Sequence, residues 1–235
     1  MRGGSAHPGI FSSMNRQTFE CAAILFDLDG VLVDSTRSVE RFWRAWAQEN
    51  GLDPEHAVSV AHGRRTVETL RILIPELDAE QEAMTLEKRE AHQTEGVTVM
   101  PGAAELLVSI PRECWCVVTS GTRYLATRRL AIAKLPCPNV LVTADDVRQG
   151  KPSPEPYLKA AELLGLKARQ CVVIEDAPAG IRAACSAGMK AIGLTTTYGA
   201  PELSEADAII SKLAELTPRV SGRQIEIHLA IDPLS

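Results

Sequence analysis

The chain lacks the long apolar stretches and the charge clusters that several classes of protein require. It has no run of about 18 apolar residues, so we expect no membrane-spanning helix. Its opening residues contain no apolar segment of about 7 to 15 residues, which a secretory signal requires. The formal net charge is −5 and no basic run occurs, which argues against a nucleic-acid partner because clustered Lys and Arg bind phosphate backbones.

The six cysteines are scattered and form neither a metal-binding nor a disulfide pattern. No CxxC motif and no paired histidines at zinc spacing occur, so the sequence predicts no zinc site. Three of the cysteines lie in apolar, strand-like runs, where a reduced thiol behaves as a small hydrophobic side chain. We therefore expect structural thiols in a reducing, cytoplasmic compartment.

Short apolar runs alternate with helical patterns over most of the chain. The expected strands are 22–26, 114–118, 140–142, 171–174 and 190–194, and the expected helices between them are 103–109, 123–133, 155–164 and 179–187. Repeated alternation of this kind implies right-handed crossovers between parallel strands. We predict an α/β fold in which a doubly wound parallel sheet is covered on both faces.

An all-helical block interrupts this pattern directly after the first strand. Its expected helices are 35–50, 54–61, 65–73 and 79–94. Chain order places the block as a lid over the carboxyl edge of the sheet. The predicted organisation is a disordered leader (1–20), a core domain (21–35 and 100–220), an inserted helical cap (36–99) and a C-terminal tail (221–235). The tail is expected to be an added edge strand or a poorly ordered end.

Two carboxylates follow the first buried strand, at its polar end. Asp27 and Asp29 stand one residue apart in the stretch AAILFDLDGVLVDS, and Gly30 lets the chain turn away. Ligands of open α/β sheets bind outside the carboxyl ends of the strands, so both acids would project where a substrate can lie. Carboxylates this close repel each other unless a cation or a proton intervenes, and oxygen-rich sites suit Mg²⁺. We therefore expect a divalent metal.

Later strand ends and loops carry further polar groups. They are Thr119, Ser120 and Gly121 in CWCVVTSGT, Lys151 between Gly150 and Pro152, and Glu175 with Asp176 in VVIEDAPAG. The hydroxyls and the backbone amides near glycine suit phosphate oxygens, and the lysine supplies a cation held by a stiff loop. The additional acids would not be tolerated beside the first pair without a metal. Together these groups predict a crevice that binds phosphate and Mg²⁺.

The motifs FDLDGV, VVTSGT, GKPSP and VIEDAPAG resemble the four ordered motifs of haloacid dehalogenase superfamily phosphatases with a helical cap. The match runs from about Ile24 to Gly199. The resemblance implies that Asp27 is the nucleophile and Asp29 the general acid and base. It also implies phosphate ligands and Mg²⁺ ligands: Thr119 and Lys151 for phosphate; Asp27, Asp176, the Asp29 carbonyl and, with less support, Glu175 for the metal.

The cap motif AHGRRTVETL is similar to an HGxRT element of fungal glycerol-3-phosphatases and 2-deoxyglucose-6-phosphate phosphatases. It matches His62, Gly63, Arg65 and Thr66. We expect His62, Gly63 and Arg65 to be substrate ligands, with Arg64 sharing the role, beside Ser120 and Gly121 of the strand end. These enzymes belong to the β-phosphoglucomutase-like branch. Mutases of that branch carry a histidine ten residues after the acid/base aspartate, where this chain has Val39.

We therefore expect a Mg²⁺-dependent phosphatase that acts on a small sugar or polyol phosphate through an aspartyl phosphate. A phosphosugar mutase and a non-catalytic phosphometabolite-binding protein remain the alternatives. The expected partner is a small phosphorylated metabolite, without nucleic acid or membrane. The protein is expected to be a monomer or a weak homo-oligomer.

Overall fold

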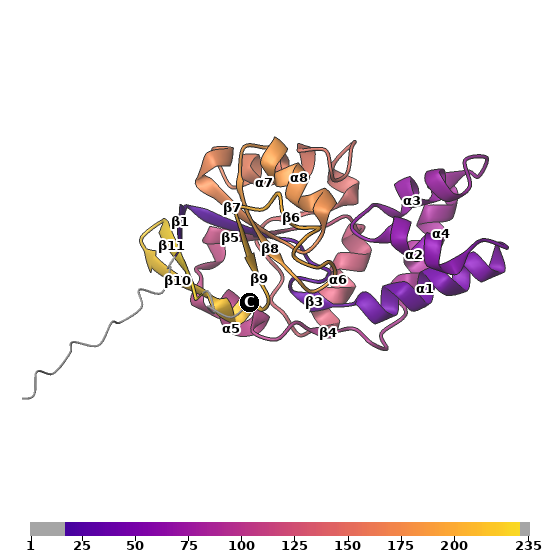
Figure 1. The fold of residues 1–235 in the computed structure, drawn as a ribbon, viewed down its shortest axis with the longest axis horizontal. Coiled ribbons are helices and arrows are strands. Elements are labelled where there is room, and N and C mark those ends of the chain that lie inside the picture. The colour runs from indigo at the N-terminus through magenta and orange to yellow at the C-terminus, as the bar shows by residue number, and fades with distance from the viewer. Residues whose placement is uncertain (1–16, 231–235) are drawn as a thin grey trace, which may run out of the picture.

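A computed structural model describes residues 17–230, and its centre is a sheet of six parallel strands (Figure 1). In spatial order the strands are β6 (Leu141–Val142), β5 (Trp115–Val118), β2 (Ala23–Phe26), β7 (Cys171–Glu175), β8 (Lys190–Leu194) and β9 (Ala208–Ile210). All neighbouring pairs are parallel. Every side chain of β2, β5 and β7 is buried, which explains why these strands are apolar up to Glu175, the last residue of β7. The predicted α/β fold with a parallel sheet is confirmed.

Helices cover both faces of this sheet. They are α5 (Ala103–Ser109) and α6 (Arg123–Ile132) on one face, and α7 (Glu155–Leu163) and α8 (Pro178–Ser186) on the other. Side chains of β2 alternate between the two layers: Ile24 and Phe26 pack with α5 and α6, whereas Ala23 and Leu25 pack with α7 and α8. The sheet is therefore doubly wound, with an apolar core on each side.

The helical cap consists of four helices inserted after the first strand of the sheet. They are α1 (Thr36–Glu49), α2 (Pro54–Ala61), α3 (Thr66–Leu73) and α4 (Ala79–Ala91). Phe42, Trp46, Leu70 and Leu86 are buried in a separate apolar core between these helices. The side chain of Asp53 caps α2 by accepting hydrogen bonds from two backbone N–H groups. The cap lies beyond the carboxyl ends of the strands, as Figure 1 shows.

A two-stranded antiparallel sheet connects the cap to the rest of the molecule. It consists of β3 (Val33–Asp34) on the way into the cap and β4 (Thr98–Val99) on the way out. The pairing aligns Val33 with Val99 and Asp34 with Thr98. Both passages of the chain between the cap and the core therefore run side by side.

The two ends of the described chain meet in a second sheet that the sequence analysis did not predict. It is antiparallel and has the order β1 (Thr18–Cys21), β11 (Gln224–Leu229) and β10 (Leu216–Ser221). Residues 18–20 were assigned to a disordered leader, which is wrong because Phe19 and Cys21 alternate into the core and β1 pairs with β11. Residues 1–16 of that leader and the tail residues 231–235 lie outside the described residues. The alternating tail segment forms the central strand of this sheet, not an edge.

Short 3-10 helices complete the described elements: η1 (Arg112–Cys114), η2 (Ala144–Asp146), η3 (Ala168–Gln170) and η4 (Leu213–Glu215). Within residues 17–230, no helix combines the length and apolar character needed to cross a membrane. All six cysteines lie in this range as free thiols.

Candidate active site

The carboxyl ends of β2, β5 and β7 meet beneath the cap at one side of the sheet. They bring Asp27, Thr119 and Asp176 to a cavity of about 90 Å³. Asp29 and Lys151, the latter from the loop before α7, line the same cavity. The side chains that the sequence analysis selected from separate segments thus converge on one small space.

Asp27 lies at the floor of this cavity and is almost fully buried. Its Oδ1 atom lies 2.5 Å from Nζ of Lys151. Burial raises the pKa of the Asp27 carboxyl to about 7. The Lys151 ammonium lowers this pKa and the carboxylates of Glu175 and Asp29 raise it further. One lysine therefore does not balance the negative charge around Asp27, which leaves room for a further cation.

Lys151 is 3% exposed and uses each of its three ammonium hydrogens. Besides Asp27, it donates to Oε1 of Glu175 at 2.6 Å and to the carbonyl of Val118 at 3.2 Å. Burial by itself lowers the pKa of Lys151, but the two carboxylates outweigh it and hold this pKa above its ordinary value. The lysine is therefore a fixed cation, as its place in a stiff loop predicts.

Both carboxylate oxygens of Glu175 already have hydrogen-bond donors. Oε1 accepts from Lys151 and from the Tyr157 hydroxyl at 3.0 Å, and Oε2 accepts from the backbone N–H groups of Asp176 and Ala177 at 3.0 Å each. A Cβ atom at Gly180 would come within 1.7 Å of Oε1, so only glycine leaves room for this carboxylate. Glu175 is therefore held in a fixed position and in turn fixes the ammonium of Lys151.

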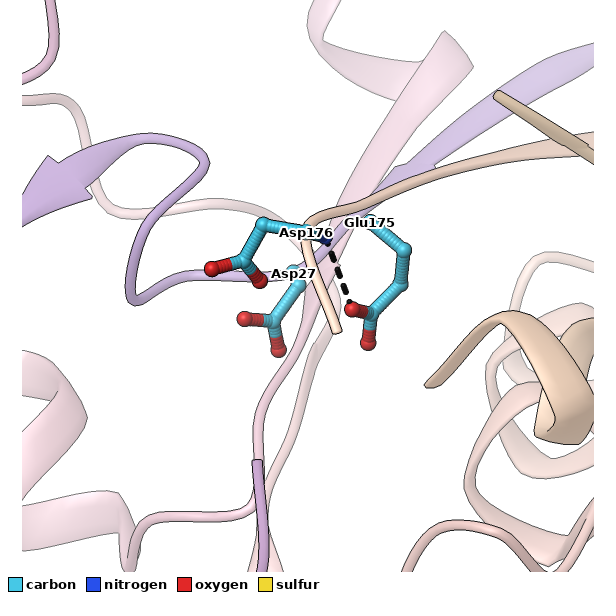
Figure 2. Close-up of side chains that lie close together, drawn as sticks. All are labelled: Asp27, Glu175 and Asp176. Atoms are coloured by element: carbon cyan, nitrogen blue, oxygen red, sulfur yellow. Dashed lines mark hydrogen bonds between the residues drawn. The ribbon is translucent and has the colours of Figure 1, made fainter. Parts of the chain in front are cut away.

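Three carboxylates, those of Asp27, Glu175 and Asp176, gather at the ends of β2 and β7, as Figure 2 shows. One oxygen of each lies within 4.8 Å of the others, and all three residues are buried. Burial, followed by the charges of Glu175 and Asp27, raises the pKa of Asp176 well above its ordinary value. Three buried acids face one ammonium, so the cluster has the hard oxygen donors and the excess negative charge that fit a divalent cation.

The close approach of Asp176 to the first loop requires a glycine at position 30. Gly30 has a φ of +81°, and a Cβ atom there would lie 1.9 Å from Oδ2 of Asp176. The same Oδ2 accepts a hydrogen bond from the hydroxyl of Thr197, in the loop after β8. Thr197 was missed by the sequence analysis because it lies outside the recognisable motifs.

Asp29 is held at both of its carboxylate oxygens. Oδ1 accepts from the Ser35 hydroxyl at 2.7 Å, and Oδ2 accepts from the Arg129 guanidinium at 2.6 Å. Arg129 also forms an ion pair with Glu90 of the cap helix α4. The sequence analysis selected none of these partners. Arg129 is separated from Asp29 by 100 positions, and it belongs to an arginine-rich helix whose pattern predicts exposure to solvent.

The loop after β5 places hydroxyl groups at the cavity. The Thr119 hydroxyl accepts the Gly121 N–H at 3.1 Å, and Ser120 donates to the carbonyl of Gly63 in the cap at 3.1 Å. All three residues of this loop and Gly63 line the cavity. The loop thus contacts the cap and offers polar groups to a ligand at the same time.

Two of the three predicted cap ligands line the cavity, and the third is placed elsewhere. His62 and Gly63 line it, and burial lowers the pKa of His62. The guanidinium of Arg65 instead donates to the carbonyls of Val147 and Arg148 at 3.3 and 3.0 Å, outside the cavity lining. Arg65 therefore attaches the cap to the loop before Lys151. The neighbouring Arg64, expected to share the role of Arg65, does line the cavity.

The parallel sheet, the inserted helices and the acidic cluster beside a buried lysine define a hydrolase class. The family model described as haloacid dehalogenase-like hydrolase matches residues 21–188, more than half of the chain. The chain belongs to this family, which confirms the resemblance of its motifs. Hydrolases of this family generally use a divalent metal, and the acidic cluster offers one a site.

Named relatives and a solved structure support the same assignment. The chain is 43% identical to hexitol phosphatase A of Escherichia coli over 84% of this chain and 94% of that protein. It is 38% identical to glycerol-1-phosphate phosphohydrolase 1 of Saccharomyces cerevisiae over 78% of each protein. The structure of a hydrolase from Pseudomonas syringae has a TM-score of 0.71 and 30% identity over 81% of this chain and 93% of that one.

Proposed function

We propose that the chain is a Mg²⁺-dependent phosphatase that hydrolyses the phosphate monoester of a small sugar or polyol. The observation that carries the proposal is the buried contact of 2.5 Å between Asp27 Oδ1 and Lys151 Nζ at the cavity floor. It places a carboxylate next to a fixed cation, which is what attack on a negatively charged phosphate group needs. Relatives named as hexitol and glycerol-1-phosphate phosphatases support this substrate class.

Asp27 serves as the nucleophile in this proposal. Its carboxylate attacks phosphorus, so an Asp27–phosphorus bond forms while the ester bond between phosphorus and the substrate oxygen breaks. The ammonium of Lys151, the hydroxyl of Thr119 and the backbone N–H of Ser120 stabilise the negative charge on the transferring group. Glu175 and the Val118 carbonyl hold Lys151 in place, so that its charge and the hydrogen it donates to Asp27 can turn to the phosphoryl oxygens as Asp27 attacks.

Asp29 serves both half-reactions. As an acid it gives a proton to the substrate oxygen, which leaves as an alcohol, and as a base it then takes a proton from the attacking water. The water oxygen bonds to phosphorus, the Asp27–phosphorus bond breaks, and inorganic phosphate and free Asp27 result. Ser35 and Arg129 hold the Asp29 carboxylate beside the cavity for both steps.

Mg²⁺ is the cation that we propose for the acidic cluster. Asp27 and Asp176 would hold it through their carboxylates and Asp29 through its main-chain carbonyl. Glu175 stays a predicted ligand, although both of its oxygens already accept hydrogen bonds. When bound, the cation supplies positive charge to the phosphoryl oxygens.

The size and lining of the cavity support a small substrate. A cavity of about 90 Å³ is well below the volume of a pocket for a drug-sized ligand, roughly 300 Å³ or more. On the cap side it is lined by Trp43, His62, Arg64 and Thr66, which combine an aromatic face with polar groups suited to hydroxyls. Val39, which stands where the mutase branch has a histidine, also lines the cavity and has no proton to exchange with a sugar hydroxyl.

The proposal is tested by an assay with hexitol, glycerol and hexose phosphates, each with added Mg²⁺ and after treatment with a chelator. We expect inorganic phosphate to be released only with the metal, and no release by the Asp27→Asn variant, which keeps nearly the same side-chain shape. Formation of an isomer without free phosphate would identify a mutase. Tight binding without turnover would identify a binding protein. Normal rates in Asp27→Asn would refute the assignment of the nucleophile.

A further inference from the structure

A buried ion-pair network links the cap to the acid/base residue. Arg129, on the core helix α6, lies between Asp29, after β2, and Glu90, on the cap helix α4. The side chains of Arg129 and Glu90 are 7% and 6% exposed, so both ionic groups lie out of contact with bulk water. Helix α6 contacts the cap helix α4, and Figure 1 shows it at the end of the core domain nearest the cap.

Each member of this network depends on the others because an unpaired buried charge is strongly unfavourable. Glu90 has no other ion-pair partner among the described residues, and Arg129 has only the two carboxylates. If the cap moved away from the sheet, Glu90 would leave with α4. Arg129 would then keep a single partner and lose the contact that fixes the direction of its guanidinium.

The geometry at Asp29 gives this network a specific effect. Arg129 donates to Oδ2, whereas the hydroxyl of Ser35 contacts Oδ1. Each oxygen of the carboxylate therefore has its own donor, one from the core helix α6 and one from the residue that precedes α1. Arg129 and Ser35 together fix the direction in which the Asp29 carboxylate points.

We propose that Arg129 and Glu90 form a positioning pair that orients the carboxylate of Asp29 when the cap lies over the sheet. This inference rests on the proposed function, since it concerns the residue that acts there as acid and base. Arg129 and Glu90 also line the cavity; in this proposal Arg129 acts through its ion pair with Asp29. The closed cap thereby completes the proton-transfer geometry as well as enclosing the substrate.

The test compares Arg129→Met with Arg128→Met, the neighbouring arginine on α6 whose side chain is exposed. The substrates are p-nitrophenyl phosphate, whose leaving group needs no proton, and a polyol phosphate, whose alkoxide does. We expect Arg129→Met to release about one equivalent of nitrophenol per active site in a fast burst and then to turn over about 10- to 100-fold more slowly than wild type. With the polyol phosphate, kcat falls by at least as much and KM changes little.

A purely structural defect would lower both substrates' rates in proportion to the folded fraction and produce no burst. Equal losses without a burst, or rates like those of Arg128→Met, would therefore overturn the proposal. Arg129→Lys should recover part of the lost kcat because a charged donor remains.

Glu90→Gln tests the cap side of the pair even if Arg129→Met does not fold. We expect the same burst with a smaller decrease in kcat, since the glutamine keeps the shape but not the charge; wild-type kinetics would refute the role of Glu90. Asp29→Asn is the reference for the proposed function. If Asp29→Asn kept the wild-type kcat, the assignment of Asp29 as acid and base would itself be refuted. If Asp29→Asn lost activity while Arg129→Met kept the wild-type kcat, only the positioning pair would be refuted.

Discussion

Replacing Gly30 by alanine tests the proposed metal site most directly. Gly30 has a φ of +81°, and a Cβ atom at this position would lie 1.9 Å from Oδ2 of Asp176. Ordinary contacts begin near 3.4 Å, so the carboxylate oxygen must move by about 1.5 Å (3.4 − 1.9). It would also leave the hydroxyl of Thr197. The substitution thus displaces a proposed metal ligand without removing any carboxylate.

The matched control is Gly51→Ala. Gly51 follows α1, has a φ of +67° and has no atom within 4 Å of an added Cβ. A side chain in the left-handed region costs about 1 kcal/mol of unfolding free energy in either position, so Gly51→Ala reports this backbone cost alone. Only Gly30→Ala carries the additional clash with Asp176.

We expect Gly30→Ala to bind Mg²⁺ about 10- to 100-fold more weakly than wild type, the range typical of a disturbed ligand environment. Gly51→Ala should bind the metal normally. Titration calorimetry with Mg²⁺ measures both affinities, and the Mg²⁺ concentration that gives half-maximal phosphate release provides a second reading. Equal Mg²⁺ affinity in Gly30→Ala and wild type would refute the assignment of Asp176 as a ligand.

Three further predictions follow from the site and the cap. Because burial raises the pKa of Asp27 from 3.8 to about 7, the metal-free folded state binds more protons than the unfolded state between those values. Its unfolding free energy should therefore fall as pH rises from about 4 to 7. Urea unfolding at pH 5 and 8 checks this, and an Asp27→Asn variant with the same slope would contradict it. Lys151→Met should lower kcat by about 10²- to 10³-fold in steady-state assays; a loss below tenfold would argue against transition-state stabilisation by the ammonium. Asp53→Ala should lower unfolding free energy by about 1 kcal/mol through the lost cap of α2, with kcat unchanged, and an unchanged urea midpoint would be inconsistent with that.

Much of the central sheet could be predicted because its strands and helices differ sharply in local pattern. The bounds 190–194, 54–61 and 103–109 match β8, α2 and α5. The residues at the strand ends converge as expected because parallel strands in one sheet end on the same side.

The second sheet and the partners of Asp29 could not be predicted in the same way. β1 is four residues long and pairs with β11, whose residues lie about 200 positions later, so no local pattern connects them. Arg129 contacts Asp29 across 100 positions, and its neighbours on α6 include exposed arginines. Arg65 belongs to a recognisable motif, but the motif does not reveal whether its guanidinium points to a ligand or to the Val147 carbonyl.

The paired strands β3 and β4 make the helical insertion a replaceable module. Val33 and Val99 face each other across one antiparallel ladder, so the two crossing points are separated by a single interstrand spacing of about 5 Å. A short turn would bridge that gap if residues 35–97 were removed, and a foreign helical unit with similarly spaced ends could be grafted in their place. Such a graft would leave the strand ends unchanged, but it would have to supply its own hydroxyl and carboxylate in place of Ser35 and Glu90, which contact Asp29 and Arg129.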